Sequence, residues 1–146
     1  MSINEIKALV EHAIQKVYAR DAALFDVDAS EWALAHRLAV YLEHSLPEWN
    51  VDCEYNRQGL GRDPKTNELD EKIRPDTTVH HRGQLAREHN LLVIEFKKRE
   101  EKTDWDKVRE LTNPPSGKRQ FQYQFGLALS FFPTLEMHWF AQGSPA

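Results

Sequence analysis

Cysteine is almost absent from this sequence of 146 residues, because Cys53 is its one thiol and an internal disulfide bond is therefore excluded. Long hydrophobic runs are also missing, and none approaches the roughly 20 residues that a membrane-spanning helix requires. The residues after Met1 do not form the basic and then apolar stretch of a secretory signal peptide. We therefore expect a cytoplasmic protein that has no membrane association.

An excess of positive charge is missing as well, since the formal net charge is -4. Proteins that grip nucleic acid across a broad surface are usually basic, so the charge argues against a protein that coats DNA or RNA. Any contact with a nucleic-acid backbone would depend on local basic patches, and we expect modest non-specific affinity.

The sequence has enough apolar material for a folded core, with 40% hydrophobic and 10% aromatic residues. A chain of this length usually forms one compact domain. It contains no repeats, no low-complexity segment and no change of composition that would mark a domain boundary. We predict one domain over residues 1–146.

Hydrophobic spacing predicts two helices in the first third of the chain. Residues 3–20 carry apolar side chains at helical intervals, and Ser2 with Glu5 forms the pattern of a capping box. Residues 21–29 are predicted to connect this helix to the next. Ser30 is the expected N-cap of the second helix, which ends before Pro47.

The remainder of the chain predicts a sheet with one further helix. The expected strands cover residues 50–56, 75–82, 91–97, about 121–132 and 135–141. The polar segment 57–73 is interpreted as a mobile loop, and residues 104–112 as a short helix that 113–117 terminates. A helix over 119–130 is the alternative to the fourth strand, but aromatic residues and alternation favour a strand. The elements together indicate a mixed α/β fold with a central sheet.

Two charged residues end the most apolar predicted strand. Glu95 and Lys97 are two positions apart, so both point to one face, while Leu92, Ile94 and Phe96 point to the other. A carboxylate and an ammonium group in such a position are costly to bury unless each has a partner. A divalent cation would stabilise the carboxylate, and a phosphate and a water molecule would contact the lysine.

A second carboxylate is expected from a neighbouring strand, because Mg²⁺ is usually held by one or two carboxylates and keeps several waters. Asp76 is suited to this role, since it follows Pro75 at the start of the preceding predicted strand. Proline is sterically acceptable at the first position of a strand. The pattern thus predicts that Asp76 and Glu95 come together on adjacent strands.

These residues resemble the signature of the PD-(D/E)xK nuclease superfamily. Arg74-Pro75-Asp76, followed by an apolar strand that leads into Glu95-Phe96-Lys97, carries the resemblance. It implies an α/β fold with a restriction-endonuclease-like core at about residues 30–141, a central mixed β-sheet flanked by helices, and an extra N-terminal helix outside that core. It further implies hydrolysis of phosphodiester bonds in nucleic acid with Mg²⁺ or Mn²⁺. DNA is the expected substrate, although the residues themselves do not distinguish DNA from RNA or endonuclease from exonuclease.

The resemblance also implies roles for individual residues. Asp76 and Glu95 would bind the metal, the Phe96 carbonyl would be a further ligand, and Lys97 would orient the attacking water. Members of the superfamily often carry a glutamate on the first core helix, and Glu31 is the candidate because it continues a buried stripe of that helix. The alternative reading of Glu31 is an acid favoured by the helix dipole in a first turn.

Three further residues are candidates for contact with a phosphate or with the metal ligands. His80 is predicted to share a strand face with Asp76, and Arg82 and Lys98 add positive charge nearby. His81 points to the opposite face, so the two histidines cannot ligate one metal. The alternative is that His80 is structural and that the cations belong to a solvated surface.

A second class of function is compatible with the same sequence. A catalytically silent module of the same fold would bind nucleic acid or a partner protein. With 146 residues the chain has little room for a separate domain that reads sequence, so a homodimer or a partner protein could supply specificity.

Overall fold

The computed structural model describes residues 1–27, 31–59, 64–66, 73–97 and 102–146, and the statements on structure refer to these ranges. The elements are α1 (Ile3–Arg20), α2 (Ala23–Asp26), α3 (Glu31–Ser45), β1 (Asn50–Cys53), β2 (Thr77–His80), the 3-10 helix η1 (Arg87–His89), β3 (Asn90–Lys97), α4 (Lys102–Leu111), β4 (Phe125–Ser130), β5 (Glu136–Ala141) and β6 (Ser144–Pro145). The architecture is thus α/β, as predicted. Within these ranges, no helix has the length and apolar character needed to cross a bilayer.

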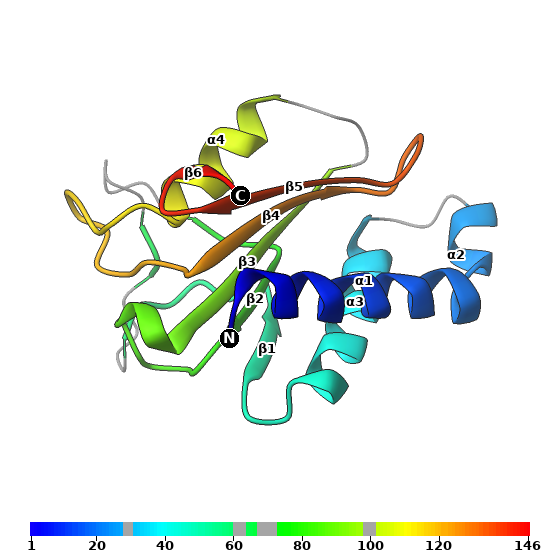
Figure 1. Ribbon diagram of the computed structural model, residues 1–146, viewed down its shortest axis with the longest axis horizontal. Coiled ribbons are helices and arrows are strands. Elements are labelled where there is room, and N and C mark those ends of the chain that lie inside the picture. Colours follow the sequence, from blue (N-terminus) through cyan, green and yellow to red (C-terminus); the bar gives the residue numbers. More distant parts are fainter. Residues whose placement is uncertain (28–30, 60–63, 67–72, 98–101) are drawn as a thin grey trace.

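The described strands form one six-stranded sheet in which spatial order equals chain order, from β1 to β6. Four neighbouring pairs are antiparallel, and the pair of β3 with β4 is parallel. Parallel neighbours require a crossover connection, and here the chain between β3 and β4 includes α4. Figure 1 shows the resulting twisted sheet with its helices.

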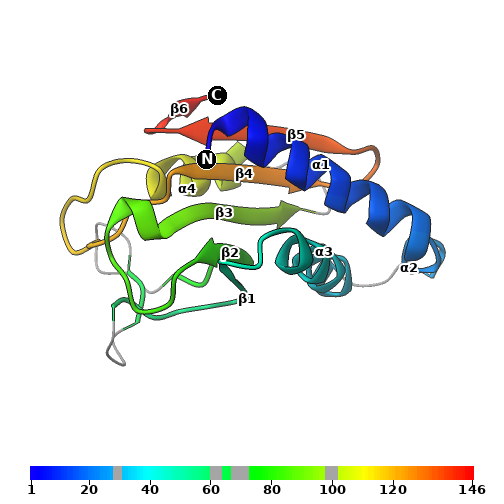
Figure 2. The same ribbon diagram turned by 60° about the horizontal axis from the view of Figure 1, so that its bottom comes forward.

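Helices cover both faces of the sheet. The larger core joins α1 and α3 to the side chains of Leu92, Ile94, Phe96, Leu127 and Leu129. Alternate residues point the other way, and on that face Val108 of α4 packs with Ala128 and Phe140. Figures 1 and 2 show α1 and α3 on one side of the sheet and α4 on the other.

The first helix is confirmed at both of its predicted ends. Ser2 caps it, because the Ser2 hydroxyl accepts from the Glu5 amide while the Glu5 carboxylate accepts from the Ser2 amide. These two reciprocal bonds satisfy amides that the first helical turn leaves without partners. The apolar stripe predicted for this helix is buried against α3, with Ile6, Val10, Ala13, Ile14 and Val17 in the core.

The predicted strands are present and all but β3 are shorter than expected, while β3 begins one residue earlier, at Asn90. The strand predicted over 50–56 ends at Cys53, because Glu54 adopts a positive φ of 53° and turns the chain out of the ladder. The strand predicted over 75–82 comprises Thr77–His80, and Asp76 precedes it. The fourth strand begins at Phe125 and not at residue 121, and the alternative helix over 119–130 is wrong.

Two connecting segments contain more structure than the sequence suggested. The link predicted over 21–29 includes the short helix α2. Part of the segment 57–73, which was expected to be a mobile loop, is anchored: Lys65 and Thr66 are buried. The Lys65 amide donates to Asn56 Oδ1 at 2.9 Å, and its carbonyl accepts from the Ile73 amide at 2.9 Å.

Candidate functional site

Asp76 lies beside the Glu95-Phe96-Lys97 segment. Its Oδ2 accepts a hydrogen bond from the Phe96 amide at 2.8 Å. Thr77 pairs with Ile94 in the antiparallel ladder of β2 and β3, so the next position along the ladder sets Asp76 opposite Glu95. The structure therefore brings the backbone positions of these two acids together at the end of β2.

A cavity of about 160 Å³ opens next to Asp76 on the side of α3. Its lining consists of Trp32, Ala35, Cys53, Glu54, Asp76 and Phe96. Glu54 brings a second carboxylate to this cavity, and its Oε1 accepts from Trp32 Nε1 at 3.0 Å. The other oxygen of Glu54 lies 3.9 Å from Arg74 Nη1. Reasoning from sequence missed Glu54, because it fell inside the predicted strand over 50–56.

The Glu95 side chain lines a different cavity. This cavity has a volume of about 40 Å³, and its lining includes Arg74, Pro75, Lys107 and Glu110 in addition to Glu95. Residues in a strand alternate between faces, so Glu95 shares with Val93 the face that α4 covers. The Arg74–Asp76 segment borders both cavities. The two acids are thus neighbours along the ladder, while their side chains line cavities on opposite sides of that segment.

Three of the predicted site residues lie partly or wholly outside the described residues. Lys97 is the last residue of β3 and Glu31 the first of α3, and the side chain of neither is described. Lys98 lies outside the described ranges altogether. Trp32, which follows Glu31, lines the cavity next to Asp76, so the first turn of α3 borders that cavity.

The donor set next to Asp76 fits a hard divalent cation. Asp76 and Glu54 supply carboxylate oxygens, and the cavity has room for coordinated waters. Within the described ranges no group of three or more His, Cys, Asp or Glu side chains converges on one point. Mg²⁺ does not require such a group, because it is commonly held by one or two carboxylates and keeps several waters.

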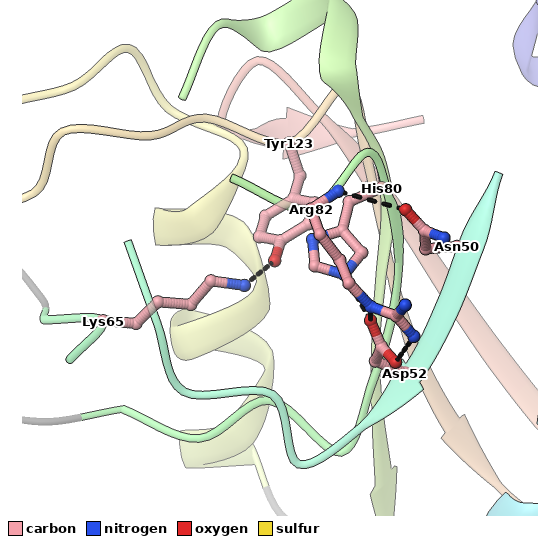
Figure 3. Close-up of polar contacts among 6 residues, drawn as sticks. All are labelled: Asn50, Asp52, Lys65, His80, Arg82 and Tyr123. Atoms are coloured by element: carbon pink, nitrogen blue, oxygen red, sulfur yellow. Dashed lines mark hydrogen bonds and ion pairs between the residues drawn. The ribbon is translucent and has the colours of Figure 1, made fainter. Parts of the chain in front are cut away.

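His80 and Arg82 both contact Asp52 on β1 (Figure 3). His80 Nε2 lies 2.8 Å from Asp52 Oδ2, and Arg82 donates to the two carboxylate oxygens at 2.8 and 2.5 Å. Burial disfavours the charged form of Asp52, but the hydrogen bonds from His80 and Arg82 outweigh it and hold the pKa of the carboxyl well below its usual value. The pKa of His80 is lowered by burial, which the bond to Asp52 partly offsets.

His80 and Arg82 differ in exposure, and this decides which of them can contact a ligand. His80 is 2% exposed and is enclosed by protein groups, which is the arrangement of a structural histidine. Tyr55 adds an edge-on ring contact to the imidazole at 4.6 Å between centroids. The Arg82 side chain is 54% exposed, so its outer face is available to solvent or to a phosphate group. Both side chains belong to the end of β2 that lies away from Asp76.

Lys65 lies in a cage of aromatic rings, which sequence reasoning did not anticipate. Its Nζ donates to the Tyr123 hydroxyl at 2.6 Å (Figure 3). The same amine lies 5.0 Å from the ring centroid of Tyr55, 5.4 Å from that of Phe121 and 5.2 Å from that of Tyr123. Burial lowers the pKa of Lys65 to about 7. A polar segment with glycine and proline around it gave no signal that one lysine would be enclosed.

Tyr123 connects this cage with the face of the sheet that carries Glu95. Its side chain is fully buried, and burial raises the pKa of the phenol well above its usual value. Glu95 and Asp52 both act on the phenol electrostatically in the same direction. Polar and aromatic side chains that contact one another therefore pack on this face of the sheet, beside Val93 and Leu111.

Comparison of the chain with models of known protein families, with curated proteins and with solved structures found no match.

Proposed function

We propose that this chain is a metal-dependent nuclease of the PD-(D/E)xK type that hydrolyses phosphodiester bonds, with DNA as its substrate. The observation that carries the proposal is the bond from the Phe96 amide to the Asp76 carboxylate at 2.8 Å. It supports placing the acid of the Pro75-Asp76 pair directly on the Glu95-Phe96-Lys97 segment. Two motifs that are 20 residues apart in the sequence thus meet at one point.

The proposed metal ligands are Asp76 and Glu95, with the Phe96 carbonyl as a further donor. The Asp76 oxygen that does not accept from Phe96 is available to an ion in the cavity of about 160 Å³. Glu95 starts from the opposite ladder position, so rotation about its side-chain torsions would bring its carboxylate to the same ion. Glu31, on the first turn of α3, and Glu54 would add negative charge around it.

The metal, when bound, would polarise a phosphate oxygen and lower the pKa of a coordinated water. Lys97 would orient that water and balance negative charge that develops on the phosphate. Trp32 borders the same cavity and is 55% exposed, so its ring offers a surface on which a nucleotide base can stack. A homodimer or a partner protein would supply any sequence specificity.

The test is cleavage of supercoiled, linear, branched and single-stranded DNA, and of RNA, with Mg²⁺ or Mn²⁺. The variants are Asp76→Asn, which keeps the size of the side chain, and Lys97→Ala. Asp106→Asn is the matched control, because Asp106 is an exposed acid on α4 that lines neither cavity. We expect cleavage by the wild type and the control, and a loss of about 10²-fold or more in each site variant.

A measurement of Mn²⁺ binding distinguishes the proposed nuclease from a catalytically silent binding module of the same fold. Mn²⁺ affinity that falls in Asp76→Asn and is unchanged in Asp106→Asn would support the metal centre independently of the substrate chosen. An absence of cleavage with either metal, together with no Asp76-dependent binding, would refute the nuclease and favour a module that binds nucleic acid or a partner protein.

A further inference from the structure

Two histidines face each other at the end of β2 that lies away from Asp76. His81 follows β2, and His89 is the last residue of η1, immediately before β3. Their Nδ1 atoms are 3.0 Å apart. The His81 amide also donates to the His89 carbonyl at 2.8 Å, so the two backbones are fixed to each other. The imidazole pair is therefore held by main chain as well as by side chains.

The contacts of His81 determine which of its nitrogens carries the proton. His81 Nε2 lies 2.9 Å from the Glu48 carbonyl oxygen, which can only accept, so Nε2 must be the donor. In the neutral ring the other nitrogen, Nδ1, is then an acceptor. It accepts from Nδ1–H of His89. The lone pair of His81 Nδ1 thus points at the Nδ1 atom of His89.

The ring of His81 is also fixed in orientation. Trp49 stacks on it with 4.1 Å between centroids and 6° between planes. A histidine that ligates a metal through one nitrogen almost always donates its other N–H to a carbonyl, a carboxylate or water, which sets the tautomer and the ring orientation. His81 already has this arrangement through Glu48 and Trp49. The tautomer that a ligating Nδ1 of His81 requires is therefore set before any metal binds.

We propose that His81 and His89 form a two-nitrogen chelate for a transition-metal ion of the Cu²⁺ or Ni²⁺ class. Two nitrogens at metal bonds of about 2.0–2.1 Å and at right angles to each other, as in tetragonal Cu²⁺ and Ni²⁺ complexes, are separated by roughly 2.9 Å. The observed separation is 3.0 Å. The ion would replace this hydrogen bond and lie to one side of the line between the two Nδ1 atoms, and water would complete its coordination.

Proton balance is simple at this site. Before the metal binds, His89 carries its proton on Nδ1; in the complex it carries that proton on Nε2, so that Nδ1 is free to ligate. His81 keeps its proton on Nε2 throughout. Neutral imidazoles therefore take up the ion with no net release of a proton, and protonation of either ring competes with the metal.

This site differs in chemistry and position from the centre proposed at Asp76. The Asp76 centre offers carboxylate oxygens, which suit Mg²⁺ and Mn²⁺, whereas imidazole nitrogens suit Cu²⁺, Ni²⁺ and Zn²⁺. The strand β2, Thr77–His80, separates them. An ion on the two histidines would link the residue after β2 to the residue before β3. It would therefore stabilise the β2–β3 connection, which His81 already joins to Glu48.

The experiment is calorimetric titration of the full chain with Ni²⁺ and with Cu²⁺, in buffer containing excess Mg²⁺. The variants are His89→Ala and the more conservative His89→Asn, with His12→Ala as control because His12 is exposed on α1. We expect one ion per chain and a loss of affinity of at least about tenfold in both His89 variants, with none in the control. His81→Ala, which also removes the stacking on Trp49, is expected to lose binding in the same way.

Nitrogen NMR of the imidazoles gives a second readout that does not depend on metal. It should show His81 protonated on Nε2 and His89 on Nδ1 in the free protein. Wild type that binds no ion, or His89 variants that bind as the wild type does, would overturn the proposal. Asp76→Asn should bind Ni²⁺ normally, so failure of the nuclease proposal and failure of this one are distinguishable.

Discussion

The enclosed amine of Lys65 makes the stability of the protein depend on pH in a way that one substitution should remove. Lys65 is 3% exposed, and burial lowers its pKa from 10.5 to about 7. The unfolded chain, in which lysine keeps its ordinary pKa, binds more protons than the folded protein between these values. Stability therefore rises with pH across this window, since the folded state prefers the neutral amine.

The expected magnitude follows from the same two values. Below pH 7 both states hold the proton and this contribution is absent, while at pH 9 the folded amine is neutral and the unfolded one is still charged. One pKa unit corresponds to about 1.4 kcal/mol, so the free energy of unfolding should gain about 2.5 kcal/mol from this group between pH 6.5 and 9. Lys65→Met keeps a side chain of similar length and cannot titrate, so it should lack this gain.

Urea denaturation at pH 6.5, 7, 8 and 9 measures the effect as the difference between wild type and Lys65→Met. Using the difference removes the contribution of all other titrating groups. Lys118→Met is the control, because Lys118 is an exposed lysine. A difference that stays within about 0.5 kcal/mol across the series would refute the assignment of a neutral amine in the cage of Tyr55, Phe121 and Tyr123.

Two further predictions concern stability. Asp52→Ala should destabilise the protein by about 3 kcal/mol in thermal or urea unfolding, because it removes the hydrogen-bond acceptor of the buried His80 and of Arg82. Since the pKa of Asp52 is held below its usual value, the stability that this carboxylate contributes is present near neutral pH and is lost as pH falls toward its folded pKa. A cost that does not decline in acid would contradict this. Gly126→Ala should cost about 1–3 kcal/mol, because the added Cβ would lie 2.6 Å from Val108 Cγ1 and 3.2 Å from the Val108 carbonyl of α4. Unchanged stability of this variant would show that α4 shifts on β4 without penalty.

The elements that local signals specify were predictable from sequence. Helix α1 was predicted at both ends, and its start follows from Ser2 and Glu5, which are neighbours in sequence and in space. Strand β3 was evident from its apolar run, and its C-terminal end at Lys97 was predicted correctly. In each case the residues that set the boundary lie within a few positions of it, so no knowledge of the tertiary fold was needed.

Boundaries that distant contacts set were not predictable in the same way. The β1 strand ends where Glu54 takes a positive φ, and its amide donates to the Asp76 carbonyl at 3.1 Å. The β2 strand begins after Asp76, because the Asp76 side chain, not its backbone, bonds to the Phe96 amide. Residue types alone mark neither point, so the prediction from sequence extends each strand too far.

The proximity of the two backbone segments in the candidate site was predictable, and the directions of their side chains and their surroundings were not. Asp76 and the Glu95-Phe96-Lys97 segment were expected on adjacent strands, and the ladder of β2 and β3 sets them side by side. That Asp76 and Glu95 line separate cavities was not foreseen, because it depends on how the chain bends before Thr77. The burial of Lys65 depends on Tyr123, which is 58 residues away, and a partner at that separation leaves no local pattern.

The order of the strands in space has a consequence for how the chain can fold. Because described strands that are neighbours in the sheet are also neighbours in the sequence, the sheet can grow by adding one strand at a time along the chain. No strand has to be inserted between two that are already paired. Pairing of β3 with β4 requires the chain to form a long loop, because these strands are parallel and α4 lies in the connection between them. The chain loses the entropy of this loop before the two strands gain contacts. We therefore expect the pairing of β3 with β4 to have the highest barrier in folding.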